Sequence, residues 1–469
     1  EHDVLLAMAD PTDLMGLDEL TRILKKRIRQ AVVRENDLLS AIDKSYRRTG
    51  EISDLAGQLD DELSDNDFDF NTLITSDEVA EAPVVKLLQS IFEDAAQINA
   101  SDIHIEPDEK VLRIRQRVDG VLNEQLLNEV KIASALVVRL KLMSGLNISE
   151  KRLPQDGRFS IRVKGKSLDI RLSTLPVTHG ESIVMRLLDH SQGLLNLEKL
   201  GIPDELLTRF KNHIKNPHGL VLVTGPTGSG KTTTLYAALS EVNKADTKII
   251  TAEDPVEYSL PRVNQSQVNE KIGLTFASVL RSALRQDPDV ILVGEMRDTE
   301  TAEIAIRASI TGHLVFSTLH TNGAVETATR LLDMGVEGYI LASALQVIIA
   351  QRLVRRLCEH CTTDTEIEEA HTIWLEKTLN CNSQSIQFKQ GSGCHHCNHT
   401  GYRGRIGVYE LLEMRHETLD ALRRNDSAAF TLAAKSTPGF MPFTECALEF
   451  VRQGITSLDE VIRITGSGA

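Results

Sequence analysis

The chain has 469 residues, a formal net charge of −15 and a hydrophobic fraction of 41%. This length predicts about three domains, and the charged fraction of 25% is typical of a chain that folds over most of its length. The acidic balance argues against a nucleic-acid-binding protein, which usually carries a basic surface. No apolar run reaches membrane-spanning length and no secretory signal opens the chain, so we expect neither a transmembrane nor an exported protein.

The first residues predict a small α/β unit over residues 1–56. Because the chain starts at Glu1 rather than Met, directly before a strand, we expect this unit to be the truncated remnant of a first N-terminal domain. The expected elements are a strand at Val4–Met8, a turn at Asp10–Asp13 and helices at Leu17–Ile28 and Glu35–Tyr46.

Residues 57–82 are acidic and poor in apolar side chains, so we expect a solvated linker there. A second α+β domain is predicted over residues 83–190, followed by a linker at 191–202. Its expected elements are a helix at Val84–Ala96, a hairpin turn at Asp119–Gly120, and strands at Asp102–Glu106, Val111–Arg117, Arg158–Val163, Ser167–Ser173 and Ser182–Leu187.

Strands alternate with helices over residues 203–350, and this alternation predicts a largely parallel sheet that is covered on both faces. The remaining chain is expected to hold a cysteine-containing module at 351–405 and a helical region at 406–469. The strands expected in the sheet are Gly219–Thr224, Lys248–Ala252, Val290–Val293 and Leu314–Thr318, with a helix at Lys231–Val242.

The sequence Gly225-Pro-Thr-Gly-Ser-Gly-Lys-Thr232 matches the phosphate-binding loop pattern, in its required place between a strand and a helix. Its glycines let backbone N–H groups turn toward phosphate oxygens, and the helix N-terminus adds a partial positive charge. We expect Lys231 to reach the β- and γ-phosphates and Thr232 to hold Mg²⁺. The residues expected to bind ATP are Gly225, Pro226, Thr227, Gly228, Ser229, Gly230, Lys231, Thr232 and Thr233.

Hydrolysis requires carboxylates near this loop, and three glutamates follow predicted strands. Glu295 ends the strand that starts at Val290, which is typical of an acid that serves the metal ion. Glu253 and Glu257 follow another strand and emerge at the same carboxyl edge of the sheet. One of the two is expected to orient water. From spacing alone, however, each of them is explained equally well as a solvated acid in a loop.

His313 and His320 lie on either side of the strand Leu314–Thr318. A lone histidine is usually a core or surface residue, but two beside one strand of a nucleotide-binding sheet could sense the γ-phosphate.

Four of the six cysteines form two C-x-x-C pairs, Cys358 with Cys361 and Cys394 with Cys397. In a long chain without a signal peptide this pattern favours a metal site over disulfides, and four thiolates predict tetrahedral Zn²⁺. Four sulfurs close the coordination shell, so we expect a structural ion. A nearby histidine could replace one thiolate, as the less favoured alternative; the candidates are His360, His395, His396 and His399.

Several motifs together resemble the type II secretion and type IV pilus assembly ATPase family over nearly the whole chain. The resemblance implies a RecA-like P-loop ATPase core, a preceding α+β domain of PAS-like type, a zinc-binding module and a helical C-terminal tail. The matching segments are Ala100–Pro107, Arg117–Gly120, Thr251–Glu257, Gly294–Asp298, Thr311–Thr321, Gly401–Arg405 and Gln453–Glu460.

The resemblance also implies roles for single residues. It makes Glu257 the catalytic base and Glu295 the acid of the Mg²⁺ site. It places His313 and His320 in the family's histidine box, with His320 approaching the γ-phosphate. Arginines of the second N-terminal domain reach the nucleotide in this family, and they match Arg171 and Arg186; such arginines contribute roughly 10³–10⁵ in rate.

The implied protein is a cytoplasmic homohexamer at the inner-membrane face that hydrolyses Mg·ATP and drives pilin addition through an inner-membrane platform protein. The cysteine pairs distinguish it from the family's retraction motors. The segments Ala7–Asp13 and Met441–Glu445 favour an MSHA-type pilus ATPase or a type II secretion ATPase that drives pseudopilus assembly and export. A nucleic-acid motor is a remoter alternative.

MSHA-type members can carry an N-terminal segment that binds cyclic di-GMP. The glycine- and leucine-rich motifs of that segment are not seen in this chain, so we expect any such function to lie before residue 1.

Overall fold

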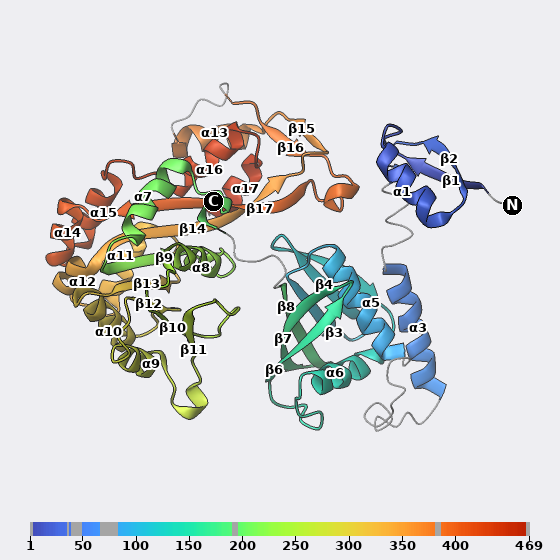
Figure 1. Cartoon of the computed structure of the whole chain (residues 1–469), viewed down its shortest axis with the longest axis horizontal. Coiled ribbons are helices and arrows are strands. Elements are labelled where there is room, and N and C mark those ends of the chain that lie inside the picture. Colours follow the sequence, from blue (N-terminus) through green and yellow to red (C-terminus); the bar gives the residue numbers. More distant parts are fainter. Residues whose placement is uncertain are drawn as a thin grey trace. The chain divides into compact units, whose positions relative to one another are not determined.

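The computed structural model describes residues 3–34, 37–38, 49–65, 83–189, 196–379 and 386–465. The chain forms two compact units, the first of residues 1–192 with 393–400 and the second of residues 193–392 with 401–469 (Figure 1). Within the described ranges, no helix has both the length and the apolar character that crossing a membrane requires.

The N-terminal residues of the first unit form a parallel strand pair joined by a helix: β1 (Asp3–Met8), α1 (Leu14–Leu24) and β2 (Arg27–Val32). The helix ends earlier than the Ile28 that periodicity predicts. Lys25 adopts a left-handed conformation with a φ of 50° and caps the helix, so the next residues leave in an extended direction and pair with β1. The second predicted helix, Glu35–Tyr46, lies almost entirely outside the described residues.

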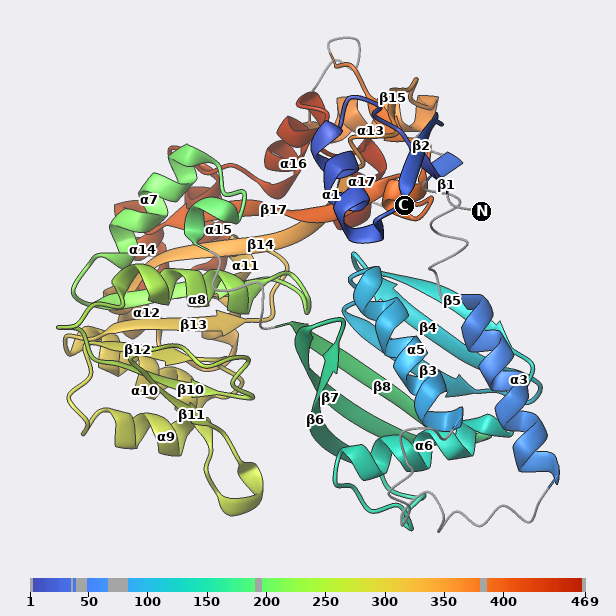
Figure 2. The ribbon, with the colours of Figure 1, turned by 45° about the vertical axis from the view of Figure 1, so that its right-hand side comes forward.

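The second N-terminal domain is a six-stranded antiparallel sheet in the order β5-β4-β3-β8-β7-β6. Figure 2 shows α5 (Pro83–Gln97) and α6 (Ile132–Met143) lying across one face of this sheet. Alternate residues of the strands face these helices and form the core, whereas the other face is polar. The strands are β3 (Asp102–Pro107), β4 (Leu112–Val118), β5 (Val121–Leu127), β6 (Gln155–Val163), β7 (Lys166–Val177) and β8 (Gly180–Asp189).

Helix α3 (Thr49–Asp65) crosses the boundary that the sequence suggests between residues 56 and 57. Its side chains Ile52, Ala56 and Leu59 are buried in the same core as α5. Residues 57–65 are therefore part of a packed amphipathic helix, because a stripe of apolar side chains at helical spacing outweighs their acidic composition. Residues 66–82 of the expected linker lie outside the described part of the chain.

The second unit contains a seven-stranded sheet in the order β11-β10-β12-β13-β9-β14-β17. All neighbouring strands are parallel except β14 and β17, which are antiparallel. The strands are β9 (Gly219–Thr224), β10 (Ile249–Glu253), β11 (Val263–Gln267), β12 (Val290–Val293), β13 (Leu314–Leu319), β14 (Leu345–Leu357) and β17 (Tyr402–Glu413).

Helices cover both faces of this sheet, as its apolar strands predict. One face packs against α7 (Asp204–Ile214) and α8 (Lys231–Val242), and the other packs against a larger set of helices. That set is α9 (Phe276–Ala283), α10 (Thr299–Ile310), α11 (Ala324–Asp333), α12 (Gly338–Ala344), α14 (His416–Arg423), α15 (Ser427–Lys435), α16 (Phe443–Arg452) and α17 (Leu458–Thr465).

Two long strands cross the domain boundaries expected at residues 350 and 405. Strand β14 adds to the parallel sheet beside β9, and β17 returns along it as the edge strand. The cysteine module lies between them in the chain and contains a short sheet of β15 (Thr362–Asp364) and β16 (Lys389–Gly391), with α13 (Glu369–Leu379) between those strands. The module is therefore an insertion between two strands of one sheet rather than a separate successor to it.

The last helix is held to β14 by the buried carboxylate of Glu460, whose side chain is 1% exposed. It accepts hydrogen bonds from the backbone and the guanidinium of Arg355, at 2.9 and 2.7 Å, and from Arg463 at 2.7 Å. Burial acts to raise the pKa of Glu460, but the bonds from Arg463 and Arg355 outweigh it and lower the pKa to about 2.

We expect Glu460→Gln to destabilise the second unit by about 2 kcal/mol at neutral pH, because the partly buried guanidinium of Arg355 and the half-exposed guanidinium of Arg463 lose their buried counter-charge. The native pKa lies below the ordinary value of 4.5, so this contribution is complete above pH 4.5 and is lost as the pH falls toward 2. Denaturant unfolding at a series of pH values should show the deficit shrinking below pH 5. Glu449→Gln, which removes a half-exposed carboxylate of α16, is the control and should change little at any pH. A deficit independent of pH would contradict the assignment.

Candidate functional site

The phosphate-binding motif forms a glycine-rich loop between β9 and α8. Gly225, Gly228 and Gly230 have φ angles of 147°, 79° and 88°, which glycine adopts without strain. A Cβ atom on Gly225 would lie 2.3 Å from the carbonyl oxygen of Gln351. The loop therefore needs glycine for its conformation and for its close approach to β14.

Lys231 is the first residue of α8, and its ammonium group lies inside the loop. It donates hydrogen bonds to the carbonyl oxygens of Gly225 at 2.8 Å and Pro226 at 3.1 Å. Burial lowers the pKa of Lys231, and the negative charge of Glu295 opposes the shift. The loop thus places a cation and the N-terminal backbone of a helix around one small volume, which suits a phosphate group.

Glu295 lies two residues beyond β12, which is separated from β9 by β13, and its charge acts on Lys231 of the phosphate-binding loop. Its side chain is 14% exposed, forms an ion pair with Arg297, and lies 3.3 Å from Nε2 of His320. Arg297 also lies 3.6 Å from Asp254, which follows β10. Burial lowers the pKa of His320, as does the charge of Lys231, so the imidazole favours its neutral form. The structure thereby brings together residues that follow four different strands.

Glu253 and Glu257, which spacing alone cannot distinguish, have different surroundings. Glu253 is 3% exposed, and its carboxylate accepts hydrogen bonds from the hydroxyls of Tyr236 and Thr251 and from the amide of Gln265. Both of its oxygens are therefore occupied within the protein. Glu257 is half-buried in the segment that follows and is tied to the same tyrosine through its backbone N–H, at 3.3 Å. The occupied oxygens of Glu253 therefore disfavour that residue as a carboxylate that acts on a bound molecule.

The structure does not bring His313 to this edge of the sheet. His313 precedes β13, whereas His320 follows it, and β13 runs parallel to β9 with Leu314 opposite Gly219. Six strand residues separate the two histidines by about 20 Å. The Nδ1 atom of His313 lies 2.9 Å from the carbonyl oxygen of Ala308, so this side chain is held at the opposite edge.

Arg171 and Arg186 are direct cross-strand neighbours on β7 and β8 of the first unit. Arg186 forms an ion pair with Asp102 at 3.2 Å. Arg158 on β6 lies opposite Arg171, so the register adds a third arginine to the same row on the polar face of the sheet. No local pattern in the sequence identifies Arg158, because only the pairing of β6 with β7 aligns it with the other two arginines. That any of them reaches a nucleotide stays a prediction.

Gln351 is a second residue that the sequence analysis missed. Its side chain is 2% exposed, and its Oε1 atom accepts a hydrogen bond of 2.6 Å from Thr234 of α8. A Cβ atom on Gly230 would lie 2.8 Å from its Nε2 atom. Gln351 therefore packs against the phosphate-binding loop and the helix that follows it. No local pattern identifies this residue, because the contact depends on the pairing of β14 with β9.

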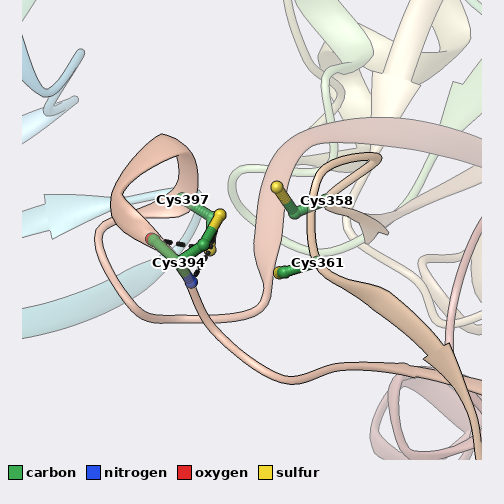
Figure 3. Close-up of side chains that lie close together, drawn as sticks. All are labelled: Cys358, Cys361, Cys394 and Cys397. Carbon is green, nitrogen blue, oxygen red and sulfur yellow. Dashed lines mark hydrogen bonds between the residues drawn. The ribbon is translucent and has the colours of Figure 1, made fainter. Parts of the chain in front are cut away.

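The four cysteines of the two C-x-x-C pairs converge from segments more than thirty residues apart (Figure 3). All four are buried and unoxidised, and their sulfur atoms lie within 4.8 Å of one another. The sulfurs of Cys394 and Cys397 are 3.8 Å apart. A tetrahedral ion with Zn–S bonds of about 2.3 Å requires sulfur separations of about 3.8 Å, so this donor set fits Zn²⁺. Among the described residues, no histidine joins the cluster.

Comparison with known proteins agrees with this geometry. Residues 77–463 match the family described as "Type II/IV secretion system protein", and residues 1–52 match the MshEN domain. The chain is 42% identical to the type II secretion system ATPase E of Vibrio cholerae, over 97% of this chain and 91% of that protein. It is also 42% identical to the type IV pilus assembly ATPase PilB of Myxococcus xanthus, over 98% of this chain and 82% of that protein.

Solved structures of related ATPases share the fold. The ADP-bound pilus retraction motor PilT is 28% identical, with a TM-score of 0.54 over 80% of this chain and 96% of that one. The ATPase DotB of Legionella pneumophila is 23% identical, with a TM-score of 0.59 over 82% of this chain and 96% of that one, a likeness of fold alone. These neighbours confirm the predicted RecA-like core. With its phosphate-binding loop and a family match over most of its length, this chain belongs to the type II/IV secretion system protein family, as one of its P-loop ATPases.

Proposed function

We propose that this chain hydrolyses Mg·ATP at the edge of its parallel sheet and uses the reaction to assemble a type IV pilus of the MSHA type. The observation that carries the proposal is the convergence of Lys231, Glu295 and His320, at the edge of the sheet where Glu257 follows β10. A buried cation and a glycine loop suit the phosphates, and the carboxylates supply what hydrolysis requires beyond binding.

In this proposal each residue has the role that its position in the site allows. Lys231 and the backbone of the loop hold the β- and γ-phosphates, and Thr232 and Glu295 hold Mg²⁺, which neutralises charge on the phosphate oxygens when it is bound. Glu257 orients water and takes its proton. His320, kept neutral by burial and by Lys231, contacts the γ-phosphate side of the site as a hydrogen-bonding group.

The arginine row of the second N-terminal domain completes the proposal. Arg171 and Arg186 would stabilise charge on the phosphate, with Arg158 beside them in register. Their contribution would make turnover depend on the position of that domain, which is how a motor couples chemistry to movement. A homohexamer at the inner-membrane face, acting on a platform protein, is the assembly that we propose.

The two relatives compared above, one named for pilus assembly and one for type II secretion, are each 42% identical to this chain, so the type II secretion ATPase is the second candidate. The match of residues 1–52 to the MshEN domain supports the pilus candidate. Deleting the gene in its own organism and scoring surface pili and exported proteins separates the two. Loss of export with normal piliation would overturn the pilus assignment.

We also propose that the four cysteines hold one structural Zn²⁺. The cluster joins the start of the module, directly after β14, to its end, directly before β17. A closed thiolate shell has no open position for chemistry, so the ion would stabilise the insertion and not take part in hydrolysis.

Replacing Glu257 by Gln should leave ATP binding within about twofold of the native value and lower steady-state turnover by at least about 10²-fold. The amide keeps the size of the side chain but cannot accept the proton of water. Phosphate release measures turnover, and binding of a fluorescent ATP analogue measures affinity. Glu205→Gln, which changes an exposed glutamate of α7, is the control and should turn over normally. Near-native turnover by the Glu257 variant would show that another residue is the base.

Replacing Lys231 by Ala should instead weaken ATP binding itself, by about 10- to 100-fold, because the phosphates lose a charged hydrogen-bond donor. Titration of the same fluorescent analogue gives the dissociation constant. Unchanged affinity would contradict the placement of the phosphates in this loop.

The native chain should contain about one zinc ion, and Cys394→Ser should lose that ion and lower the unfolding temperature. Elemental analysis and calorimetry measure the two effects. Cys446→Ser is the matched control, since Cys446 is an equally buried cysteine outside the cluster and its variant should keep the zinc. A zinc-free Cys394 variant with an unchanged unfolding temperature would exclude a structural role.

A further inference from the structure

The segment His320–Gly323, which we call the histidine loop, joins β13 to α11 and is tied to the strand that carries the phosphate-binding loop. The hydroxyls of Thr321 and Thr224 are 2.5 Å apart, and the backbone N–H of Thr321 donates to the hydroxyl of Thr224 at 3.3 Å. Thr224 is the last residue of β9, directly before Gly225. The start of the histidine loop is therefore hydrogen-bonded to the residue that precedes the phosphate-binding loop.

Arg352 of β14 fixes the next residue of the histidine loop. Its guanidinium donates a hydrogen bond of 2.9 Å to the carbonyl oxygen of Asn322, and it lies 5.0 Å above the ring of Phe443. Phe443 is the first residue of α16. Arg352 thus contacts the histidine loop and a C-terminal helix with one planar group.

Glu410 of β17 fixes the far end of the histidine loop. One oxygen of its carboxylate accepts from the backbone N–H of Ala324, the first residue of α11, and the other accepts from the N–H of Phe443; both distances are 3.0 Å. The side chain is 9% exposed. A buried carboxylate that bridges two helix N-termini holds both in place, since each presents unpaired N–H groups and partial positive charge.

These contacts leave the histidine loop little freedom. A Cβ atom on Gly323 would lie 2.4 Å from an oxygen of Glu326 and 3.2 Å from one of Glu410, so the backbone is packed directly against carboxylates. Thr321, Asn322 and Ala324 each have a fixed partner. His320, at the start of the loop, is the residue left to face Glu295.

We propose that Arg352 and Glu410 are positioning residues for hydrolysis: they hold the histidine loop so that His320 meets Glu295, and they connect that loop to the first residue of α16. This inference rests on the role proposed above for His320. Arg352 and Glu410 thereby also connect helix α16 to the edge of the sheet where Lys231, Glu295 and His320 lie.

The chain offers a matched control for Glu410 on the same strand. Glu413 lies three residues further along β17 and is 8% exposed. Its carboxylate binds Arg209 and His213, both at 3.0 Å, and these belong to α7 on the other face of the sheet. Glu413→Gln therefore removes an equally buried charge without touching the histidine loop.

The experiment compares Glu410→Gln, Glu413→Gln, His320→Ala and the double variant of Glu410 and His320 in the full-length chain. Glu410→Gln should lower kcat by about tenfold or more, since displacing a catalytic group by about 1 Å can cost 10²-fold, and should leave the Kd for Mg·ATP within about twofold. Glu413→Gln should keep a native kcat. In the His320→Ala background, Glu410→Gln should have no further effect on kcat, because both changes remove the same contribution of His320 to catalysis.

Each other outcome is decisive. Native turnover by His320→Ala would remove the proposed role of His320 and the inference with it. A slow His320→Ala variant beside a normal Glu410→Gln variant would overturn the inference alone, as would equal losses in the Glu410 and Glu413 variants or additive losses in the double variant. If Glu410→Gln unfolds at a lower temperature than Glu413→Gln, Arg352→Lys serves in its place. This change keeps the charge and loses the planar contact, so it should give the same kcat loss at native stability.

Discussion

The parallel alignment of β10, β12, β13 and β9 is the constraint on which this protein depends. Because four neighbouring strands point the same way, the chain emerges from each of them at one edge of the sheet. That edge receives the phosphate-binding loop, the segment with Glu253 and Glu257, then Glu295 and finally His320. Apolar side chains on both faces of these strands stabilise their alignment. Site residues close to a strand end therefore have well-defined positions relative to the sheet.

Strands β14 and β17 extend this sheet, and β14 links its candidate site to other parts of the second unit. Gln351 and Arg352 are adjacent on β14 and point to opposite faces, as strand geometry requires. The first supports the glycine loop, and the second contacts the histidine loop. The same strand leads into the cysteine module, and Glu460 of the last helix binds its Arg355. Strand β14 thereby contacts the candidate site, the cysteine module and the C-terminal helices.

Three buried carboxylates of this unit, those of Glu410, Glu413 and Glu460, are paired with backbone N–H groups or with cationic side chains. Glu410 accepts from two helix N-termini, and Glu413 and Glu460 accept from cationic side chains. Each pairing joins elements that are far apart in the sequence. Such networks contribute less to net stability than to the choice of one arrangement, because a carboxylate left without its partners inside the protein would be costly.

The sequence by itself determined the chemistry of the protein: a phosphate-binding loop between a strand and a helix, carboxylates after apolar strands, and two cysteine pairs that converge. These features depend on residues close together in the chain or on a simple rule about strand ends. Only the tertiary structure showed that the oxygens of Glu253 are already hydrogen-bonded within the protein, placed His313 at the opposite edge, aligned Arg158 with Arg171, and revealed β17 and the contacts of Gln351 and Glu410. Those outcomes depend on strand register and on burial, which arise from contacts between residues tens to hundreds of positions apart and therefore leave no local pattern.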